Sequence, residues 1–415
     1  MPQRNKMRTA LPGGSGGNTA TPSFTRLRTA LTVFFALDGF LFAGWVVRIP
    51  AVKHRTGATA STLGLALLGV SAGAVITMML TGVLCRRYGG HAVTVACGLL
   101  LSLSIALPAR TGSALTLGLV LLVFGAAYGG MNVAMNSVAV DLVRAMRRPV
   151  MPSFHAAYSF GGMAGAGLGG LVASRLSPGS HLLALTGVGL LVTAITGPVL
   201  LGGRTTAAAP TEERDRGAGE PDEQPHRMGP HTRRVVVLFG VIALCTAYGE
   251  GALAEWGALH LSQDLRAGPG LAAAGYSVFA LTMAIGRLTG TTLLERFGQT
   301  RTLVAGGLTA AAGMMFGALA PTVWLTLLGF AVAGLGLANI FPVAVGRAGA
   351  LAGPGGVAAA STLGYGGMLL GPPVIGFLAD WVSLPAALTT VALLAATAAV
   401  LGFAARNAGT PERFE

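Results

Sequence analysis

Charged side chains are scarce in this chain. Asp, Glu, Lys and Arg make up 10% of its 415 residues, whereas hydrophobic residues make up 53%. A soluble protein of this length would carry about 25% charged residues to cover its surface. The apolar content also excludes disorder, and the 63 glycines follow no Gly-X-Y period, which excludes a collagen-like chain. The remaining class is an all-α integral membrane protein.

Cysteine and lysine are also scarce, and the histidines are not clustered. The three cysteines, Cys85, Cys97 and Cys245, lie in or beside apolar segments and are too few for a disulfide scaffold or a Cys-rich metal site. The seven histidines show no metal-binding spacing, and no Gly-Lys-Ser/Thr phosphate loop occurs. We therefore expect no cofactor and no metal, and neither a membrane-embedded enzyme nor an ATP-driven pump is favoured.

A net charge of +13 would suit a nucleic-acid-binding protein, but the basic residues are dispersed among short loops. We therefore expect the lipid bilayer, and not a nucleic acid, as the partner of this chain. A membrane-spanning helix needs about 20 apolar residues. By this measure the sequence predicts twelve spans, near residues 28–50, 61–84, 92–109, 114–140, 153–174, 182–203, 233–260, 270–292, 300–318, 323–345, 356–379 and 384–404.

Lys and Arg favour cytoplasmic loops, so their distribution predicts the orientation. With the N-terminus inside, the inner segments hold 21 basic residues and the outer loops, Arg48 and Lys53 included, hold 6. Arg287 alone is left inside a span. The sequence therefore predicts a multi-pass protein of a bacterial cytoplasmic membrane, with both termini in the cytoplasm.

The domain organisation follows from one long polar insertion. Residues 204–232 contain six acids and are interrupted by Pro and Gly, which predicts a disordered cytoplasmic linker. This linker separates two six-helix bundles, at 26–203 and 233–405. Residues 1–25 and 406–415 are predicted to be a disordered cytoplasmic tail and a second cytoplasmic tail.

The two halves carry a repeated pattern, as in transporters built from internal repeats. Leu84–Gly89, which ends in Arg-Tyr-Gly, corresponds to Leu293–Gly298, which ends in Arg-Phe-Gly. Phe160-Gly161-Gly162-Met163 corresponds to Tyr365-Gly366-Gly367-Met368. Two more pairs keep the same order: Val-Ala-Val at 138–140 and 343–345, and an acid before glycine at Asp38 and Glu250. The chain is therefore expected to be pseudo-symmetric.

These features resemble the major facilitator superfamily (MFS) from about Arg28 to Arg406. Gly82–Gly89 is similar to that family's G-x-L-x-D-R-x-G signature, with Arg86 in place of the Asp, and the second copy keeps an acid as Glu295. Gly44–Pro50 looks like the corresponding segment of a bacterial subgroup that is often placed near sugar permeases. The resemblance implies secondary active transport by alternating access, and leaves the substrate open.

Acids within the spans are the main candidates for function, because ionisable groups at that depth are costly. Asp38 lies at mid-span, and Phe42 and Trp45 follow on the same helical face, so the three could line one cavity for a neutral or cationic solute. The alternative is that Asp38 only fixes helix packing. Glu250 and Glu255 lie about 140° apart on a helix, so only one is expected to face a given cavity.

Proton coupling is expected, with Glu250 as the carrier and Asp38 or Glu255 as the other candidates. Glu255 could instead be a solvated residue of an outer gate. Further solute-binding candidates are polar or aromatic residues within spans: Asn132, Asn136, Tyr158, Trp256, Asn339 and Tyr365. Some of these could instead be interfacial aromatics or polar contacts between helices.

The repeated corner motif predicts a gate. Arg86 and Arg87 in the first half, with Glu295 and Arg296 in the second, could brace the cytoplasmic ends of the two bundles. Taken together, the sequence predicts a monomeric, proton-coupled secondary transporter of a small organic solute. A sensor on the same fold, or a drug-efflux antiporter, is the alternative, although Gly165-Ala166-Gly167 lacks the proline typical of such antiporters.

Overall fold

The computed structural model describes residues 24–146, 150–203 and 229–407, and this part of the chain forms helices and short connections without any strand. Most of the predicted tails and linker lie outside these residues. The α-helices are α1 Phe24–Val46, α2 Ile49–Thr56, α3 Ala60–Tyr88, α4 Gly90–Ser104, α5 Ala114–Met146, α6 Met151–Val172, α7 Pro178–Gly202, α9 Pro230–Gln263, α10 Pro269–Leu319, α11 Val323–Leu337, α12 Ile340–Trp381 and α13 Leu384–Ala404.

The helices account for the predicted spans, with α10 covering two of them and α12 covering one and part of another. Ten segments of the described chain are long and apolar enough to cross a membrane, and α6, which covers most of the predicted span 153–174, is not among them. Helix α10 counts once among them but contains two predicted spans, which meet at the non-helical residue Gly298. In α12 the break lies at Ala352 and Gly353, so its first part continues the span that α11 begins. The predicted all-α membrane fold is confirmed.

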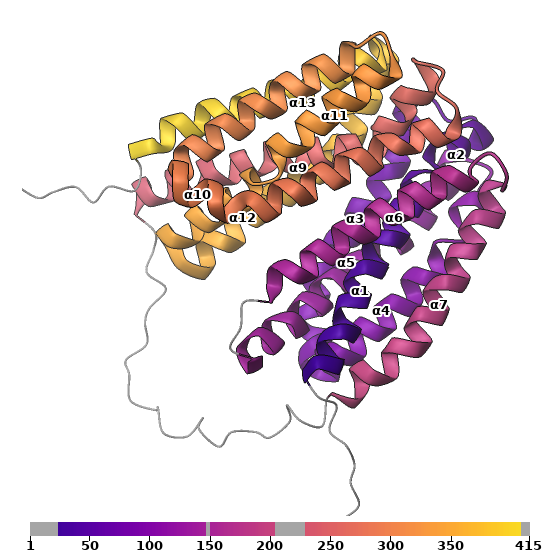
Figure 1. The fold of residues 1–415 in the computed structure, drawn as a ribbon, viewed down its shortest axis with the longest axis horizontal. Coiled ribbons are helices and arrows are strands. Elements are labelled where there is room, and N and C mark those ends of the chain that lie inside the picture. Colours follow the sequence, from indigo (N-terminus) through magenta and orange to yellow (C-terminus); the bar gives the residue numbers. More distant parts are fainter. Residues whose placement is uncertain (1–23, 147–149, 204–228, 408–415) are drawn as a thin grey trace, which may run out of the picture.

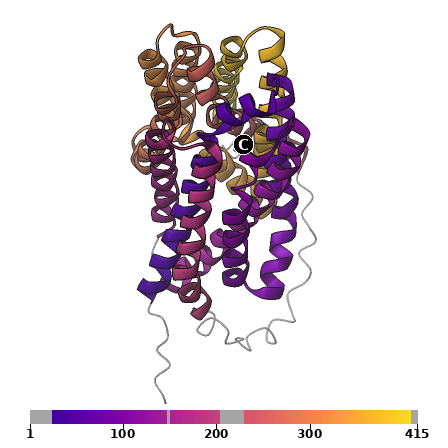
Figure 2. The ribbon, with the colours of Figure 1, turned by 90° about the vertical axis from the view of Figure 1, so that its right-hand side faces the viewer.

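The described helices form two bundles, α1–α7 and α9–α13, which occupy separate parts of Figure 1 and overlap in the upper half of Figure 2. Small residues let helices within a bundle approach closely. A Cβ on Gly161 or Gly165 of α6 would collide with the backbone of α1 at Ala36 or Phe40. The glycine-rich spans are therefore packing surfaces that hold each bundle together.

The repeat is visible in the backbone of two matching corners. Gly89 has φ 84° between α3 and α4, and Gly298 has φ 75° at the break in α10. Residues with a side chain rarely adopt such angles. The glycine that ends each copy of the corner motif is thus required by the turn that joins the second and third spans of each half.

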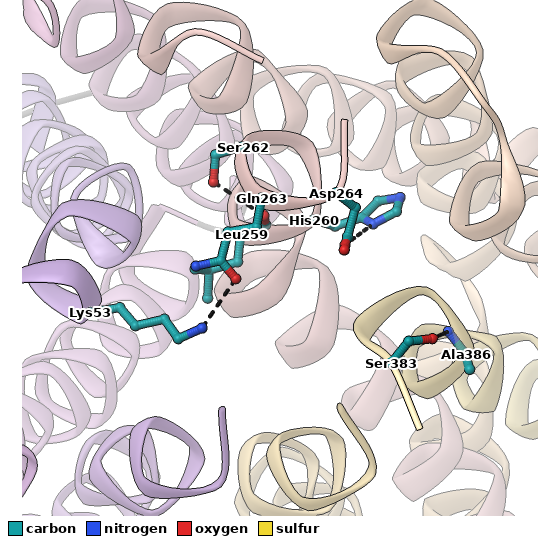
Figure 3. Close-up of polar contacts among 8 residues, drawn as sticks. All are labelled: Lys53, Leu259, His260, Ser262, Gln263, Asp264, Ser383 and Ala386. Atoms are coloured by element: carbon teal, nitrogen blue, oxygen red, sulfur yellow. Dashed lines mark hydrogen bonds and ion pairs between the residues drawn. The ribbon is translucent and has the colours of Figure 1, made fainter. Parts of the chain in front are cut away.

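The bundles meet at one end of the molecule, here called the closed end and defined by Lys53, Ser61, Gln263 and Asp380. The Asp380 carboxylate accepts hydrogen bonds from the backbone N–H groups of Ala60 (3.0 Å) and Ser61 (2.7 Å), and from the Ser61 hydroxyl. Lys53 Nζ donates to Gln263 Oε1 at 3.1 Å (Figure 3). Away from this end the two bundles diverge (Figure 1).

The first connection at the closed end differs from the predicted loop. The first span ends at Val46, four residues before the expected boundary, and α2 follows it. Arg48, expected in an exposed outer loop, is buried; its Nε donates to His181 Nδ1 at 2.8 Å. Burial lowers the pKa of Lys53 on α2, and the Asp380 and Asp264 carboxylates partly oppose this shift.

Candidate functional site

A cavity of about 310 Å³ lies between the two bundles. Its wall combines α1, α3, α5 and α6 of one bundle with α9, α10 and α12 of the other. Its polar or ionisable residues are Ser71, Tyr128, Asn132, His155, Tyr158, Ser159, Glu250, Glu255, Tyr276, Arg287 and Tyr365. Ligand pockets for small molecules begin at about this volume, so the space suits a small organic solute.

An ion pair lies in the wall of this cavity. Arg287 Nη2 on α10 is 3.1 Å and 3.3 Å from the two carboxylate oxygens of Glu250 on α9. The side chains are 32% and 25% exposed, respectively, so the pair faces the cavity without being sealed from it. Glu250 thus lines the cavity, and its role in transport stays a prediction. Its partner was missed, although a single arginine inside a span was a signal for one.

Glu255 also lines the cavity, which makes the expectation that only one of the two acids could face it wrong. The residues between them on the helix face are Gly251 and Ala254, whose small size lets the cavity extend around a wide arc of α9. Glu255 is only 6% exposed, and its Oε2 has no hydrogen-bond partner among the described residues. It is therefore not the solvated gate residue that the sequence left open.

Aromatic rings form much of the remaining wall. Phe42 stacks on Tyr128 with ring centroids 5.0 Å apart, and meets Tyr276 edge-on at 6.4 Å. The hydroxyls of Tyr128 and Tyr158 are 2.7 Å apart and share a hydrogen bond. Tyr276 comes from the opposite bundle, so this cluster spans the interface. Tyr128 and Tyr276 were not among the predicted residues, although Tyr128 lies four residues before Asn132, on the same helical face.

The predicted asparagine pair divides between the wall and the helix behind it. Asn132 lines the cavity, and so does Tyr365 on α12. Asn136 does not: its Nδ2 donates to the backbone oxygen of Asn132 at 2.8 Å. One helical face therefore presents a single amide to the cavity, because the second amide is held by its own helix.

Asp38 and Trp45 do not line the cavity, which corrects the expectation that they share it with Phe42. Asp38 is fully buried, and within residues 24–146, 150–203 and 229–407 neither of its carboxylate oxygens has a hydrogen-bond partner. Trp45 is 1% exposed and packs near Phe124, with ring centroids 6.5 Å apart. The α1 face predicted to line a cavity instead turns into the core of its own bundle, and only Phe42 of the three reaches the wall.

Two predicted residues of the second half also lie outside the wall. Trp256 is fully buried, and its indole N–H has no partner in the described part of the chain. Asn339 lies between α11 and α12, where its Nδ2 donates to the backbone oxygen of Gly286 at 2.8 Å. Its amide therefore joins two helices, which is the helix-contact alternative for this residue.

The predicted gate residues are exposed at the two corners. Arg86, Arg87, Glu295 and Arg296 all face outward or lie at the surface, and no ion pair within 4.0 Å joins the two corners in the described part of the chain. Arg87 lies over the ring of Tyr88 at 5.4 Å. The corners belong to the diverging end of the bundles, which accounts for their separation.

Comparisons with known proteins identify the family. The Major Facilitator Superfamily sequence profile matches residues 29–254 and again 239–414. An uncharacterized MFS-type transporter of Yersinia pestis is 33% identical over 378 residues, covering 90% of this chain and 94% of that protein. Membrane protein MosC of Rhizobium meliloti is 30% identical over 405 residues, covering 96% and 95%.

Solved structures show the same fold at low identity. The nucleoside transporter NupG superposes with a TM-score of 0.67 at 15% identity, covering 93% of this chain and 100% of that one. A bacterial homologue of the human lysosomal transporter Spinster, inward-facing and unoccupied, gives 0.73 at 15% identity, covering 94% and 98%. Two bundles with a polar cavity between them, a repeated corner motif and these relatives lead to one conclusion: the chain is a membrane transporter of the major facilitator superfamily.

Proposed function

We propose that this protein moves a small organic solute across a bacterial cytoplasmic membrane by alternating access, coupled to protons. The observation that carries the proposal is the cavity of about 310 Å³ between the bundles, with a carboxylate-guanidinium pair in its wall. In transporters built from repeats, two halves rock around a site near the membrane midplane. A cavity shared by both halves is where such rocking changes the exposure of a bound solute.

The arrangement of contacts supports an inward-open state. Two side-chain contacts join the bundles at the closed end, Ser61 with Asp380 and Lys53 with Gln263, and a third, from the Ser71 hydroxyl to the Met368 backbone oxygen, lies in the cavity wall. The corner motifs lie at the other end, which the distribution of basic residues assigns to the cytoplasm. We therefore place the termini and the open side of the cavity in the cytoplasm, and we take the protein to act as a monomer.

Glu250 is the proposed proton carrier, and its pairing with Arg287 suggests how coupling works. A proton on Glu250 removes the charge that holds Arg287, and loss of the proton restores the pair. Since the two residues lie on different helices of the second bundle, α9 and α10, making and breaking this pair changes how the wall is held together. Asp38 and Glu255 are the alternative carriers.

Solute-dependent proton flux into liposomes tests this function. The purified protein, reconstituted with a pH-sensitive dye inside the vesicles, is exposed to a panel of organic solutes under a pH gradient. We expect at least one solute to elicit flux, and Glu250→Gln to keep solute exchange while losing accumulation driven by the pH gradient. Full pH-driven accumulation by this variant would remove Glu250 from the role, and sodium-dependent transport indifferent to pH would refute proton coupling.

A further inference from the structure

The charged residues of the cavity wall do not balance. Glu250 and Arg287 neutralise each other, with Nη2 within 3.3 Å of both carboxylate oxygens. Glu255 lines the same cavity and forms no ion pair, and its Oε2 has no hydrogen-bond partner in the described part of the chain. The wall therefore holds one more carboxyl group than it has positive partners, and Glu255 ionises at little cost only when a cation lies beside it.

Asp38 adds a second acid without a counter-charge just outside the wall. It is fully buried in the first bundle, and both of its oxygens are unpartnered as far as the described residues go. It lies one helical turn from Phe42, which is part of the wall. Clefts lined by one sign of charge, with walls of low dielectric, concentrate ions of the opposite sign. Glu255, the acid of the wall without a counter-charge, thus favours a cation in this cavity.

The arginine of the wall is a poor site for an anion. A carboxylate or phosphate on a solute would compete with Glu250 for Arg287, and displacing Glu250 would leave a second unpaired carboxylate. A cation beside Glu255 has the opposite effect, because it compensates a charge that is otherwise costly to bury. The balance of charges therefore separates the two classes of solute.

The rings of the wall suit a cation with a flat apolar body. Phe42, Tyr128 and Tyr276 form a continuous aromatic cluster with centroids 5.0 to 6.4 Å apart. Aromatic faces attract ammonium groups and pack against planar rings. The Tyr128 and Tyr158 hydroxyls and the Asn132 amide offer donors and acceptors for a hydroxyl group on the same solute.

We propose that this cavity selects a solute with one protonated amine and a small planar body, with Glu255 as the counter-charge of the amine. The proposal rests on the proposed transport function and names its substrate class. It assigns Glu255 to the solute and leaves Glu250 with Arg287 for the proton. Neutral and anionic solutes of the same shape should bind more weakly.

Three matched probes test the charge preference. Tyramine, tyrosol and 4-hydroxyphenylacetate share a phenol ring and differ in carrying a cation, an alcohol or an anion. Binding to the purified full chain in nanodiscs is measured at neutral pH by calorimetry and by the shift in unfolding temperature. For the wild type we expect tyramine to bind at least about tenfold more tightly than tyrosol, and the anion to bind most weakly.

Glu255→Gln should abolish this preference by bringing tyramine and tyrosol to about equal affinity. Asp141→Asn is the matched control, since it removes one negative charge from an exposed position at the end of α5, away from the cavity. That variant should keep the wild-type ratio. The comparison of probes on the wild type stands by itself if Glu255→Gln does not fold.

Each other outcome overturns the amine assignment. Equal or tighter binding of tyrosol or the anion, no binding of tyramine at millimolar concentration, or a preference that survives in Glu255→Gln would each do so. The liposome flux assay separates this failure from that of the proposed function. If only neutral or anionic solutes elicit flux, the proposed transport function stands and the amine assignment fails. If tyramine binds but no solute elicits flux, the amine assignment stands and the proposed transport function fails.

Discussion

Asp38 and Glu250 are the two acids followed by glycine that the sequence predicted to correspond in the two halves, yet their surroundings differ. Asp38 is fully buried in its own bundle, and its oxygens find no partner among the residues that the structure describes. Glu250 faces the shared cavity and is paired with Arg287. A short sequence match between the halves therefore does not determine the surroundings of an acid, whereas the partner from a neighbouring helix does.

The largest expected effect comes from removing the partner that distinguishes the two acids. Arg287→Met leaves the Glu250 carboxylate uncompensated in the cavity wall, so we expect pH-driven transport to fall to background. Breaking a fully buried pair costs about 3–5 kcal/mol, and the exposure of this pair reduces the expected loss of stability to about 1–2 kcal/mol. Thermal unfolding and liposome transport measure the two effects.

The double variant Glu250→Gln with Arg287→Met sharpens this test. Since it removes both charges together, it should recover most of the lost unfolding temperature, while pH-driven transport stays absent. A double variant that accumulates solute at the wild-type rate would show that the pair is structural only. Equal stability of wild type and Arg287→Met would show that Glu250 does not depend on its partner.

The next effect concerns the acid of the first half. Asp38→Asn keeps the shape of the side chain and removes its charge, and no partner is left unpaired because Asp38 has none in the described part of the chain. We expect transport of the solute found with the panel to be abolished, with stability changed by less than about 1 kcal/mol. Normal transport by a well-expressed variant would contradict a functional role, and poor expression would point to packing instead.

Sequence alone predicted the parts of this fold that depend on periodicity and composition. Hydropathy predicted the spans, and the repeated corner motif predicted matching turns, because Gly89 and Gly298 both need positive φ. The sequence alone could not predict which side of a helix faces the cavity. Trp45 turns into its bundle because Phe124 packs against it, and Glu255 reaches the cavity because Gly251 and Ala254 are small.

Contacts between residues of different helices were the second feature that the sequence could not predict. Arg287 is 37 residues from Glu250, and nothing in the spacing of either residue indicates their contact. Tyr276 joins an aromatic cluster whose other members come from the first bundle. Both contacts depend on how the helices are rotated and tilted against one another, which a single sequence does not encode as a local pattern.

A smaller effect is expected from a substitution at the closed end, which tests how contacts there affect the equilibrium between the two open states. Asp380→Asn removes the charge of the carboxylate that accepts hydrogen bonds from the backbone N–H groups at the start of α3. One contact that holds the bundles together is therefore weakened. An exposed contact of this kind contributes about 0.3–1 kcal/mol. We expect a shift of up to about fivefold towards the state that is open at this end.

Spin labels at Tyr88→Cys and Phe297→Cys, in a chain whose three native cysteines are replaced, report this shift. The two positions are exposed at the matching corners. The short-distance population should rise in Asp380→Asn, because opening one end brings the corners together. Ser61→Ala, which removes only the hydroxyl donor to Asp380, should shift the distribution in the same direction by less. An unchanged distribution in both variants would remove Asp380 as a contact that stabilises the closed end.

The smallest expected effect lies at the corners themselves. Glu295 is exposed and forms no ion pair with the residues described here, so Glu295→Lys should leave the inward-open state unchanged in energy. In the alternative state the corners approach, and the new lysine would face Arg86 and Arg87, which disfavours that state by less than about 1 kcal/mol.

The same label pair should therefore show fewer short distances, and Arg86→Glu combined with Glu295→Lys should restore them, because it again places opposite charges across the corners. Salt should weaken both changes, since exposed charges are screened. An identical label distribution in the wild type and in Glu295→Lys at low salt would show that the corner motif acts only as a turn. The equilibrium between the two open states would then be set at the closed end, by contacts such as those of Asp380 and Lys53.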